Sequence, residues 1–405
     1  MIDVISSKKC CGCEACRQIC PKDCISIVID EEGFSYPKVN LENCIDCHLC
    51  EKVCPMLTPG ASAKPLAIEA QQITNEQIRL ESSSGGSFSA IAELIISKGG
   101  YVFGAALTKD LTVEYRSTNK AEELAQFRGS KYVQCNPLNA YSEALRLLKE
   151  DKWVLFSGTP CYIRGFLLFL RKPYDKLVTI DIICHGVPSN EILKAYLRDE
   201  IREYCKTLQT NKSDISITSV NFRNKLHGWK HYCLSISLTN RKNKEQDCII
   251  RSNSSFNKGY GANIFLRPSC HFCPSRSFSS GSDFTLGDYW GIDEQHPELD
   301  DDSGTSIVAI KTQKAQQILS EIKSLKRLEI TDTTEAYKRQ ISIYKSLPPS
   351  KYRDEFWQSN WKDDFGNVVL RICSRKSTKK RVVNSIKFVL RSLGIKKLLL
   401  KIKNK

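Results

Sequence analysis

Two short stretches of this chain repeat one another and decide how its N-terminal part folds. Residues 10–21 read CCGCEACRQICP, and residues 44–55 read CIDCHLCEKVCP. Each stretch spaces four cysteines as C-x2-C-x2-C-x3-C and places a proline directly after the fourth. The two short steps wrap three thiolates around one centre, and the longer step carries the fourth thiolate away on a helical turn. The repeat therefore predicts two metal–thiolate centres that exchange their fourth ligand.

This spacing is typical of bacterial ferredoxins that hold two 4Fe-4S clusters. The exchange predicts one cluster on Cys10, Cys13, Cys16 and Cys54, and a second on Cys44, Cys47, Cys50 and Cys20. The alternative is a pair of structural zinc sites, but zinc prefers two cysteine pairs separated by a longer loop. Cys11, Cys24 and His48 are surplus to the pattern, and we interpret them as packing or solvent-facing residues.

The segment between the two runs predicts a β-hairpin. Ile25, Ile27 and Ile29 alternate, a Glu-Glu-Gly turn follows, and residues 34–39 return. We expect a ferredoxin domain over residues 1–58, followed by a linker at residues 58–65, where the sequence TPGASAKP has linker composition.

The bulk composition predicts a folded, cytoplasmic protein. Of 405 residues, 41% are apolar, which is enough for a core. No run of eighteen apolar residues predicts a membrane-spanning helix, and the N-terminus lacks the apolar stretch of a secretory signal. The nineteen cysteines are odd in number and clustered, which favours metal ligands in a reducing compartment over disulfides.

The positive charge is concentrated in the C-terminal tail. Residues 371–405 hold thirteen of the Lys and Arg residues and no acidic ones, so the net charge of +15 falls to +2 over residues 1–370. This balance argues against a nucleic-acid surface. The tail predicts a basic amphipathic helix that docks reversibly on an anionic membrane. A helix packed on the body, or bound to an acidic partner, is the alternative.

The body, residues 66–345, alternates apolar strands with segments of helical period, which predicts an α+β fold: a ferredoxin-like module followed by a mixed α/β domain with a central sheet. The expected strands are 100–106, 153–156, 177–183, 284–291 and 307–310, with a β-rich stretch over 215–238. The expected helices are 90–98, 138–149, 163–170 and 191–204.

Two segments of the body could hold an anionic cofactor. Residues 82–88 read SSSGGSF and lead into a helix, so backbone N–H groups and the helix N-terminus favour a flavin or nucleotide phosphate. The alternative is an ordinary serine cap after a glycine turn. Residues 127–132, FRGSKY, combine two cations with two aromatic rings, although a solvated turn has the same composition.

Four further cysteines suggest a third centre. Cys270 and Cys273 form a C-x2-C pair that supplies only two ligands. Cys161 and Cys184 each follow a predicted strand on a glycine-containing turn, so they are the best candidates to complete the set. The four predict a third 4Fe-4S cluster, with zinc as the alternative metal.

An ordered set of strings across the body resembles the beta subunit family of coenzyme F420 hydrogenase/dehydrogenase. The strings are SSSGGSFSA, RGSKYVQ, SGTPCYIRGF, IDIICHGVPS, CHFC and SDFTLGDYWGI. The resemblance implies FAD beside a 4Fe-4S cluster, with Ser84, Gly85, Gly86 and Ser87 near the flavin phosphates, Lys131 near the flavin, and Cys161, Cys184, Cys270 and Cys273 on the cluster.

The resemblance implies a flavin-dependent iron–sulfur oxidoreductase. Electrons would pass between a redox partner protein or ferredoxin, the clusters and FAD, with hydride transfer to or from an organic substrate or a deazaflavin. Some bacterial members of the family are associated with cell-surface polysaccharide synthesis. The second hypothesis is an electron-carrier subunit of a larger redox complex with no substrate of its own. A third, an iron–sulfur structural or sensing protein, predicts clusters without flavin.

Overall fold

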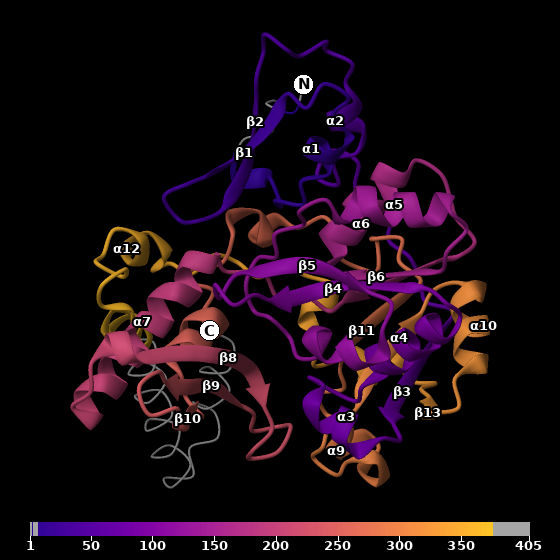
Figure 1. Cartoon of the computed structure of the whole chain (residues 1–405). Helices are drawn as coiled ribbons and strands as arrows, with labels where there is room; N and C mark the ends of the chain where they lie inside the picture. Colours follow the sequence, from indigo (N-terminus) through magenta and orange to yellow (C-terminus); the bar gives the residue numbers. More distant parts are fainter. Residues whose placement is uncertain (1, 3–6, 376–405) are drawn as a thin grey trace, which may run out of the picture.

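The computed structural model describes Ile2 and residues 7–375. It contains a small N-terminal module, a large mixed sheet covered by helices, and a second, three-stranded sheet (Figure 1). This arrangement confirms the predicted α+β fold with an N-terminal ferredoxin-like module. The basic tail from residue 376 onward lies outside the described residues. Within the described part of the chain, no helix is long and apolar enough to cross a bilayer.

The N-terminal module contains the expected hairpin. Its elements are η2 (Ser7–Lys9), α1 (Ala15–Ile19), β1 (Ile25–Ile29), β2 (Ser35–Val39) and α2 (Leu49–Lys52). Strands β1 and β2 pair antiparallel, with Ile25 opposite Val39 and Ile29 opposite Ser35. Both short helices begin at a residue with left-handed backbone, Glu14 before α1 and His48 before α2. The sequence repeat is therefore also a repeat of local structure.

The large sheet has eight strands in the order β13-β3-β12-β11-β7-β6-β4-β5. Their bounds are β3 (Ala67–Ile73), β4 (Tyr101–Leu107), β5 (Val113–Thr118), β6 (Val154–Gly158), β7 (Leu177–Ile182), β11 (Phe284–Asp288), β12 (Ser306–Ile310) and β13 (Leu325–Glu329). The four central strands β4, β6, β7 and β11 are parallel, and the outer strands pair antiparallel. Parallel strands bring their carboxyl ends to one edge, which is where ligands bind in open α/β sheets.

Helices cover both faces of this sheet. They are α3 (Glu76–Glu81), α4 (Ser87–Ser97), α5 (Ala140–Lys149), α6 (Pro160–Leu170) and α10 (Gln313–Glu321), with the shorter η3 (Ala121–Phe127), η5 (Pro268–Phe272), α9 (Ile292–Gln295), η6 (Pro297–Leu299), α11 (Thr333–Tyr337) and η7 (Ile341–Ile343). Helices α4 and α10 pack on one face, and α5 and α6 on the other.

The second sheet has the order β10-β9-β8 and packs against α7 and the C-terminal helices. Its elements are α7 (Asn190–Leu208), η4 (Lys212–Asp214), β8 (Ile215–Asn224), β9 (Cys233–Asn240), β10 (Gln246–Arg251), α8 (Ser255–Gly261) and α12 (Arg353–Trp357), followed by helical residues 365–375. Figure 1 shows this unit beside the large sheet.

The ferredoxin module lies directly on helices α5 and α6 (Figure 1). Cys11, Cys13 and Ala15 belong to the same hydrophobic cluster as Tyr141 and Phe166 of those helices. A Cβ at Gly165 of α6 would lie 3.0 Å from the sulfur of Cys13, so glycine permits this close approach. The module and the body therefore share one core.

The segment expected to be a linker is also docked on the body. The backbone N–H of Ala63 donates to the Ser277 carbonyl at 3.1 Å, and that of Leu66 donates to the Ile310 carbonyl at 2.8 Å. A Cβ at Gly60 would lie 1.8 Å from the Ser279 carbonyl oxygen. Residues 58–65 have linker composition, but they run against the protein surface and are fixed at both ends.

Candidate redox centres

The first predicted cysteine set gathers around one cavity in the ferredoxin module. Cys10, Cys13, Cys16 and Cys54 all line a space of about 190 Å³. Burial raises the pKa of Cys16, and the neighbouring Cys10 and Cys54 raise it further. Buried thiols that raise one another's pKa need a cation to become thiolates, and iron supplies it. The donor set and the cavity fit a 4Fe-4S cluster.

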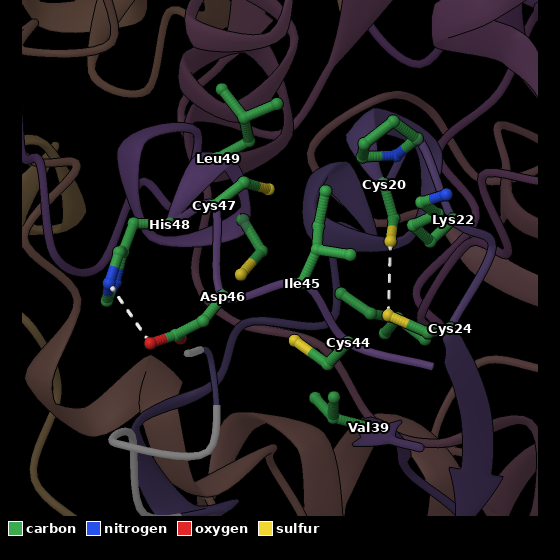
Figure 2. A pocket seen from close by; sticks show the side chains of 13 residues that line it. Cys20, Lys22, Cys24, Val39, Cys44, Ile45, Asp46, Cys47, His48 and Leu49 are labelled. Atoms are coloured by element: carbon green, nitrogen blue, oxygen red, sulfur yellow. Dashed lines mark hydrogen bonds and ion pairs between the residues drawn. The ribbon is translucent and has the colours of Figure 1, made fainter. Parts of the chain in front are cut away.

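The second set surrounds a smaller space, about 20 Å³. Figure 2 shows Cys20, Cys44 and Cys47 around it, and Cys50 lines it as well. Cys47 is exposed to solvent, whereas Cys13, Cys16 and Cys54 of the first set are buried. The second set is therefore the more exposed of the two.

The two cysteines outside the pattern both lie beside the predicted ligands. The sulfur of Cys24 is 3.4 Å from that of Cys20 (Figure 2). Cys11 lines the cavity of the first set and also a much larger cavity in the body. A side-chain hydrogen bond with Cys13 raises the pKa of Cys11, and one with Cys161 acts in the opposite direction. Cys11 is buried, as expected for a packing residue, but it lies where two candidate centres meet.

The four cysteines proposed for a third centre converge at the carboxyl edge of the parallel strands. Cys161 follows β6 and Cys184 follows β7, and these strands are neighbours. Burial, followed by the charges of Cys184 and Cys161, raises the pKa of Cys270. Burial and the charge of Cys161 also raise the pKa of Cys273, to about 11.

Glycine again allows the backbone to approach. Gly186 has a φ of +143°, and a Cβ there would lie 3.3 Å from the Cβ of Cys270. Within residues 7–375, no three His, Cys, Asp or Glu side chains stand close enough together to hold a single metal ion.

All four of these cysteines line one large cavity of about 620 Å³. This volume lies within the range of roughly 300–1,000 Å³ typical of ligand sites. The Ser82–Ser84 segment, Ser87 and the 127–135 segment form other parts of its wall. The structure thus brings together the predicted third centre and both segments that the sequence suggested for a flavin.

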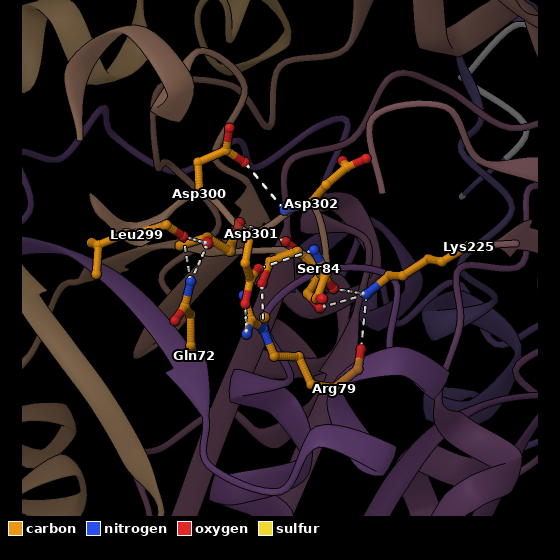
Figure 3. Close-up of polar contacts among 12 residues, drawn as sticks. Gln72, Arg79, Ser84, Lys225, Leu299, Asp300, Asp301 and Asp302 are labelled. Atoms are coloured by element: carbon orange, nitrogen blue, oxygen red, sulfur yellow. Dashed lines mark hydrogen bonds and ion pairs between the residues drawn. The ribbon is translucent and has the colours of Figure 1, made fainter. Parts of the chain in front are cut away.

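The serine–glycine segment is held in place by buried cations. The ammonium of Lys225 donates to the carbonyl oxygens of Arg79, Ser84 and Ser303 at 2.8, 3.0 and 2.6 Å (Figure 3). Arg79 in turn makes a bidentate contact with Asp301, at 2.6 and 2.7 Å. Burial lowers the pKa of Lys225 to about 7, while its three carbonyl partners favour the charged form.

Within that segment, Ser87 is the residue best placed for a ligand. It begins helix α4 and is 1% exposed, and its hydroxyl has no hydrogen-bond partner among the described residues. Ser87 also lines the large cavity. An unpartnered buried hydroxyl at the N-terminus of an eleven-residue helix fits a phosphate oxygen.

Its neighbours have structural partners of their own. The hydroxyl of Ser84 donates to the Thr305 carbonyl at 2.7 Å. The N–H of Gly85 donates to the Ser306 hydroxyl at 2.9 Å, and a Cβ at Gly85 would lie 2.1 Å from the Gln71 carbonyl oxygen. Gly85 is not part of the cavity wall, whereas Ser84, Gly86 and Ser87 are.

Lys131 lies in the cavity wall, and its ammonium group is hydrogen-bonded within the loop that carries it. It donates to the carbonyl oxygens of Gln126 and Arg128 at 2.7 and 2.8 Å. Burial lowers its pKa to about 7. The loop is tied to the serine segment because the N–H of Ser130 donates to the Ser83 hydroxyl at 2.6 Å.

The structure adds a buried ion pair that the sequence did not reveal. Arg223, with 3% of its side chain exposed, contacts both carboxylate oxygens of Asp288 at 2.9 and 3.0 Å. Its guanidinium lies 4.0 Å from the Tyr232 ring centroid and 5.5 Å from that of Trp290. The SDFTLGDYWGI string contains Asp288, but its partner lies 65 residues away in the chain.

Two family models match separate parts of this chain. Residues 9–57 match the model of the 4Fe-4S dicluster domain, and residues 151–336 match that of the C terminus of the beta subunit of coenzyme F420 hydrogenase/dehydrogenase. No curated protein matches the chain. One similar solved chain comes from the xenon-derivatised F420-reducing [NiFe] hydrogenase complex of Methanosarcina barkeri, with 15% identity and a TM-score of 0.46 over 70% of this chain and 90% of that one.

The fold and the two cysteine runs define an iron–sulfur electron-transfer protein of the oxidoreductase type. Residues 9–57 are similar to a 4Fe-4S dicluster domain and residues 151–336 to the C terminus of the beta subunit of coenzyme F420 hydrogenase/dehydrogenase, which confirms the resemblance drawn from the sequence. The domain boundaries and the individual ligands remain predictions.

Proposed function

We propose that this chain is a flavin-dependent iron–sulfur oxidoreductase with three 4Fe-4S clusters and one FAD. The convergence of Cys161, Cys184, Cys270 and Cys273 with the serine–glycine segment on one cavity carries the proposal. A cofactor that exchanges electrons with a cluster must lie beside it, and a shared cavity supplies that arrangement.

The chemistry of each residue assigns it either to the third cluster or to FAD. The four cysteines offer thiolates to the third cluster. Ser84, Gly86 and Ser87 would lie along the flavin phosphates, and Gly85 would support them through its packing on β3. Lys131 and the aromatic rings of Tyr132, Tyr260 and Trp290 line the rest of the cavity, where a flat ring can stack.

When bound, FAD would supply hydride chemistry on one side and single-electron exchange on the other. The chain's own part is to hold the phosphates, orient the ring and exclude water. Arg223 would help to orient the ring and to exclude water, because it donates to the hydroxyl of Tyr132 at 3.0 Å and to the Ser83 carbonyl at 3.2 Å in the cavity wall. The buried Arg223–Asp288 pair therefore makes that wall rigid.

The substrate of the proposed reaction is an organic hydride donor or acceptor, or a deazaflavin. Electrons would be exchanged with a redox partner protein or ferredoxin at the exposed second centre. A role in cell-surface polysaccharide synthesis rests on the family resemblance alone. Peripheral contact with a membrane rests on the composition of the basic tail.

Cofactor content tests the proposal. Protein purified anaerobically should contain about twelve iron, matching acid-labile sulfide and one FAD per chain. About eight iron without flavin would contradict the third cluster and the flavin together. About eight iron with about one zinc per chain would support the alternative metal at Cys161, Cys184, Cys270 and Cys273.

One observation favours the second candidate, an electron-carrier subunit. Phe272, between two of the proposed ligands, is 72% exposed, and Ile341 at the cavity wall is 59% exposed. Exposed apolar side chains beside a redox centre suit a partner surface. If the isolated chain binds flavin and transfers hydride to or from an organic substrate, the result would favour the enzyme over the electron-carrier subunit.

A further inference from the structure

The side chain of Arg267 is fully buried, with 0% exposed, where the ferredoxin module meets the body. It precedes Cys270 by three residues. Its Nε donates to the Cys10 carbonyl at 2.7 Å, its Nη1 to the Gln134 side chain at 2.6 Å, and its Nη2 to the Ser35 carbonyl at 2.8 Å. One guanidinium thus joins both parts of the chain.

Within the described residues no carboxylate contacts this buried cation, and Glu14, which lies within electrostatic range, is already paired with Arg17 at 2.8 Å. Its three partners are uncharged oxygens, and the rings of Tyr36 and Phe34 lie 4.4 and 5.3 Å from it. An arginine guanidinium stays charged in proteins, and a buried charge is strongly unfavourable unless an opposite charge lies close by.

A 4Fe-4S cluster with four thiolate ligands is an anion, and Cys10 is a predicted ligand of the first cluster. We propose that Arg267 is the counter-charge of the first ferredoxin cluster, that it raises the reduction potential of that cluster, and that it positions the cluster loop against the third centre. This inference rests on the cluster assignments of the proposed function.

A second contact supports the positioning role. The hydroxyl of Tyr162, the residue after Cys161, donates to the Gly12 carbonyl at 2.8 Å. A Cβ at Gly12 would lie 2.3 Å from the amide nitrogen of Gln134 and 2.9 Å from Nη1 of Arg267, so no side chain fits between the loop and the body. The cluster loop is therefore clamped by residues that neighbour two proposed ligands of the third centre.

Cys11 lies between the cluster loop and the body. It lines the cavities of both the first and the third centre, and it interacts with Cys13 on one side and Cys161 on the other. Cys11 therefore lies between the first centre and the proposed third centre.

The sign of the electrostatic effect follows from charge alone. Reduction adds an electron to a centre that is already negative, so a nearby cation stabilises the reduced state more than the oxidised one. Nearby charge and hydrogen bonds are known to tune iron–sulfur potentials. Removing the charge of Arg267 should therefore make the potential of the first cluster more negative.

Redox titration of the full chain, followed by electron paramagnetic resonance, tests this. In Arg267→Gln, the ratio of reduced to oxidised cluster for one ferredoxin signal should fall at least tenfold at a fixed applied potential. For a one-electron couple, this fall corresponds to a reduction potential that is at least 59 mV more negative. The other ferredoxin signal should not move. In Arg267→Lys, we expect a smaller shift in the same direction, because an ammonium keeps the charge but cannot reach all three acceptors.

Arg353→Gln combined with Glu32→Gln is the matched control. Arg353 also ties the ferredoxin module to the body, through Glu32 at 2.7 Å, and replacing both members of the pair leaves the net charge unchanged. We expect no shift in that double variant. Unchanged potentials in Arg267→Gln, or an equal shift in the double variant, would overturn the inference.

If Arg267→Gln fails to assemble its clusters, Arg267→Met decides, because it also removes the charge. A wild-type potential in Arg267→Met would leave only a structural role and overturn the inference. A wild-type protein that lacks the ferredoxin signals would instead contradict the cluster assignments on which the inference rests.

Discussion

Removing half of the proposed ligands of the third centre should empty that centre and leave the other two intact. The change is Cys270→Ala together with Cys273→Ala. The two thiols that remain, Cys161 and Cys184, cannot hold a four-iron cluster alone. Iron should therefore fall by about four of about twelve per chain, with acid-labile sulfide falling in parallel.

The loss should be confined to this centre because the segment has anchors other than the cluster. The N–H of Arg267 donates to the Val187 carbonyl at 2.8 Å. The ring Nδ1 of His271 lies 2.8 Å from the Leu347 carbonyl, and the Ser346 hydroxyl donates to the Cys273 carbonyl at 3.3 Å. We expect this variant to fold, and its ferredoxin clusters to be reduced by dithionite as in the wild type.

The matched control is Cys135→Ala together with Cys205→Ala. Cys135 lines the same cavity without belonging to the proposed ligand set, and Cys205 is buried in helix α7. Its iron content should equal that of the wild type. Unchanged iron in the Cys270/Cys273 variant, or an equal loss in the control, would refute the reasoning.

Four other changes probe separate parts of the chain. Cys47→Ser should remove about one cluster's worth of iron, and unchanged iron would contradict the assignment of the second centre. Ser87→Ala should raise the flavin dissociation constant by about two- to tenfold at constant iron, as expected for one hydrogen bond of about 0.5–1.5 kcal/mol; equal affinity would remove Ser87 from the site. Because burial lowers the pKa of Lys131 to about 7, its positive charge is lost as the pH rises through 7. Flavin affinity should therefore fall from pH 6 to pH 8, and Lys131→Met should abolish that dependence; a slope that persists in the variant would assign it to another group. Deleting residues 371–405 should lower co-sedimentation with anionic vesicles at low salt, and equal binding would rule out membrane docking by the tail.

Short-range patterns predicted a large part of this architecture. The cysteine spacing and the proline after each run predicted the ferredoxin-like module, including the hairpin, now β1 and β2. The strands expected at residues 153–156 and 177–183 are β6 and β7. Because these strands are parallel neighbours, the cysteines that follow them lie together, which the sequence suggested from their strand-end positions alone.

The contacts that complete the centres could not be read from the sequence, because they join distant segments. Arg267 reaches Cys10 across 257 residues, and Arg223 reaches Asp288 across 65. Neither arginine stands in a recognisable motif. The order of the large sheet was also unpredictable, because β3 and β13 pair with each other across about 250 residues and carry no periodicity that places them together.

The docked course of residues 58–65 has a consequence for how electrons are supplied. A free ferredoxin must find its partner by diffusion, and its occupancy depends on its concentration in the cell. Here the carrier is covalently attached and held in register by the Ala63 and Leu66 contacts, so its effective concentration at the body is fixed and independent of expression level. Under the proposed function, competition among external electron carriers would take place at the solvent-exposed edge around Cys47.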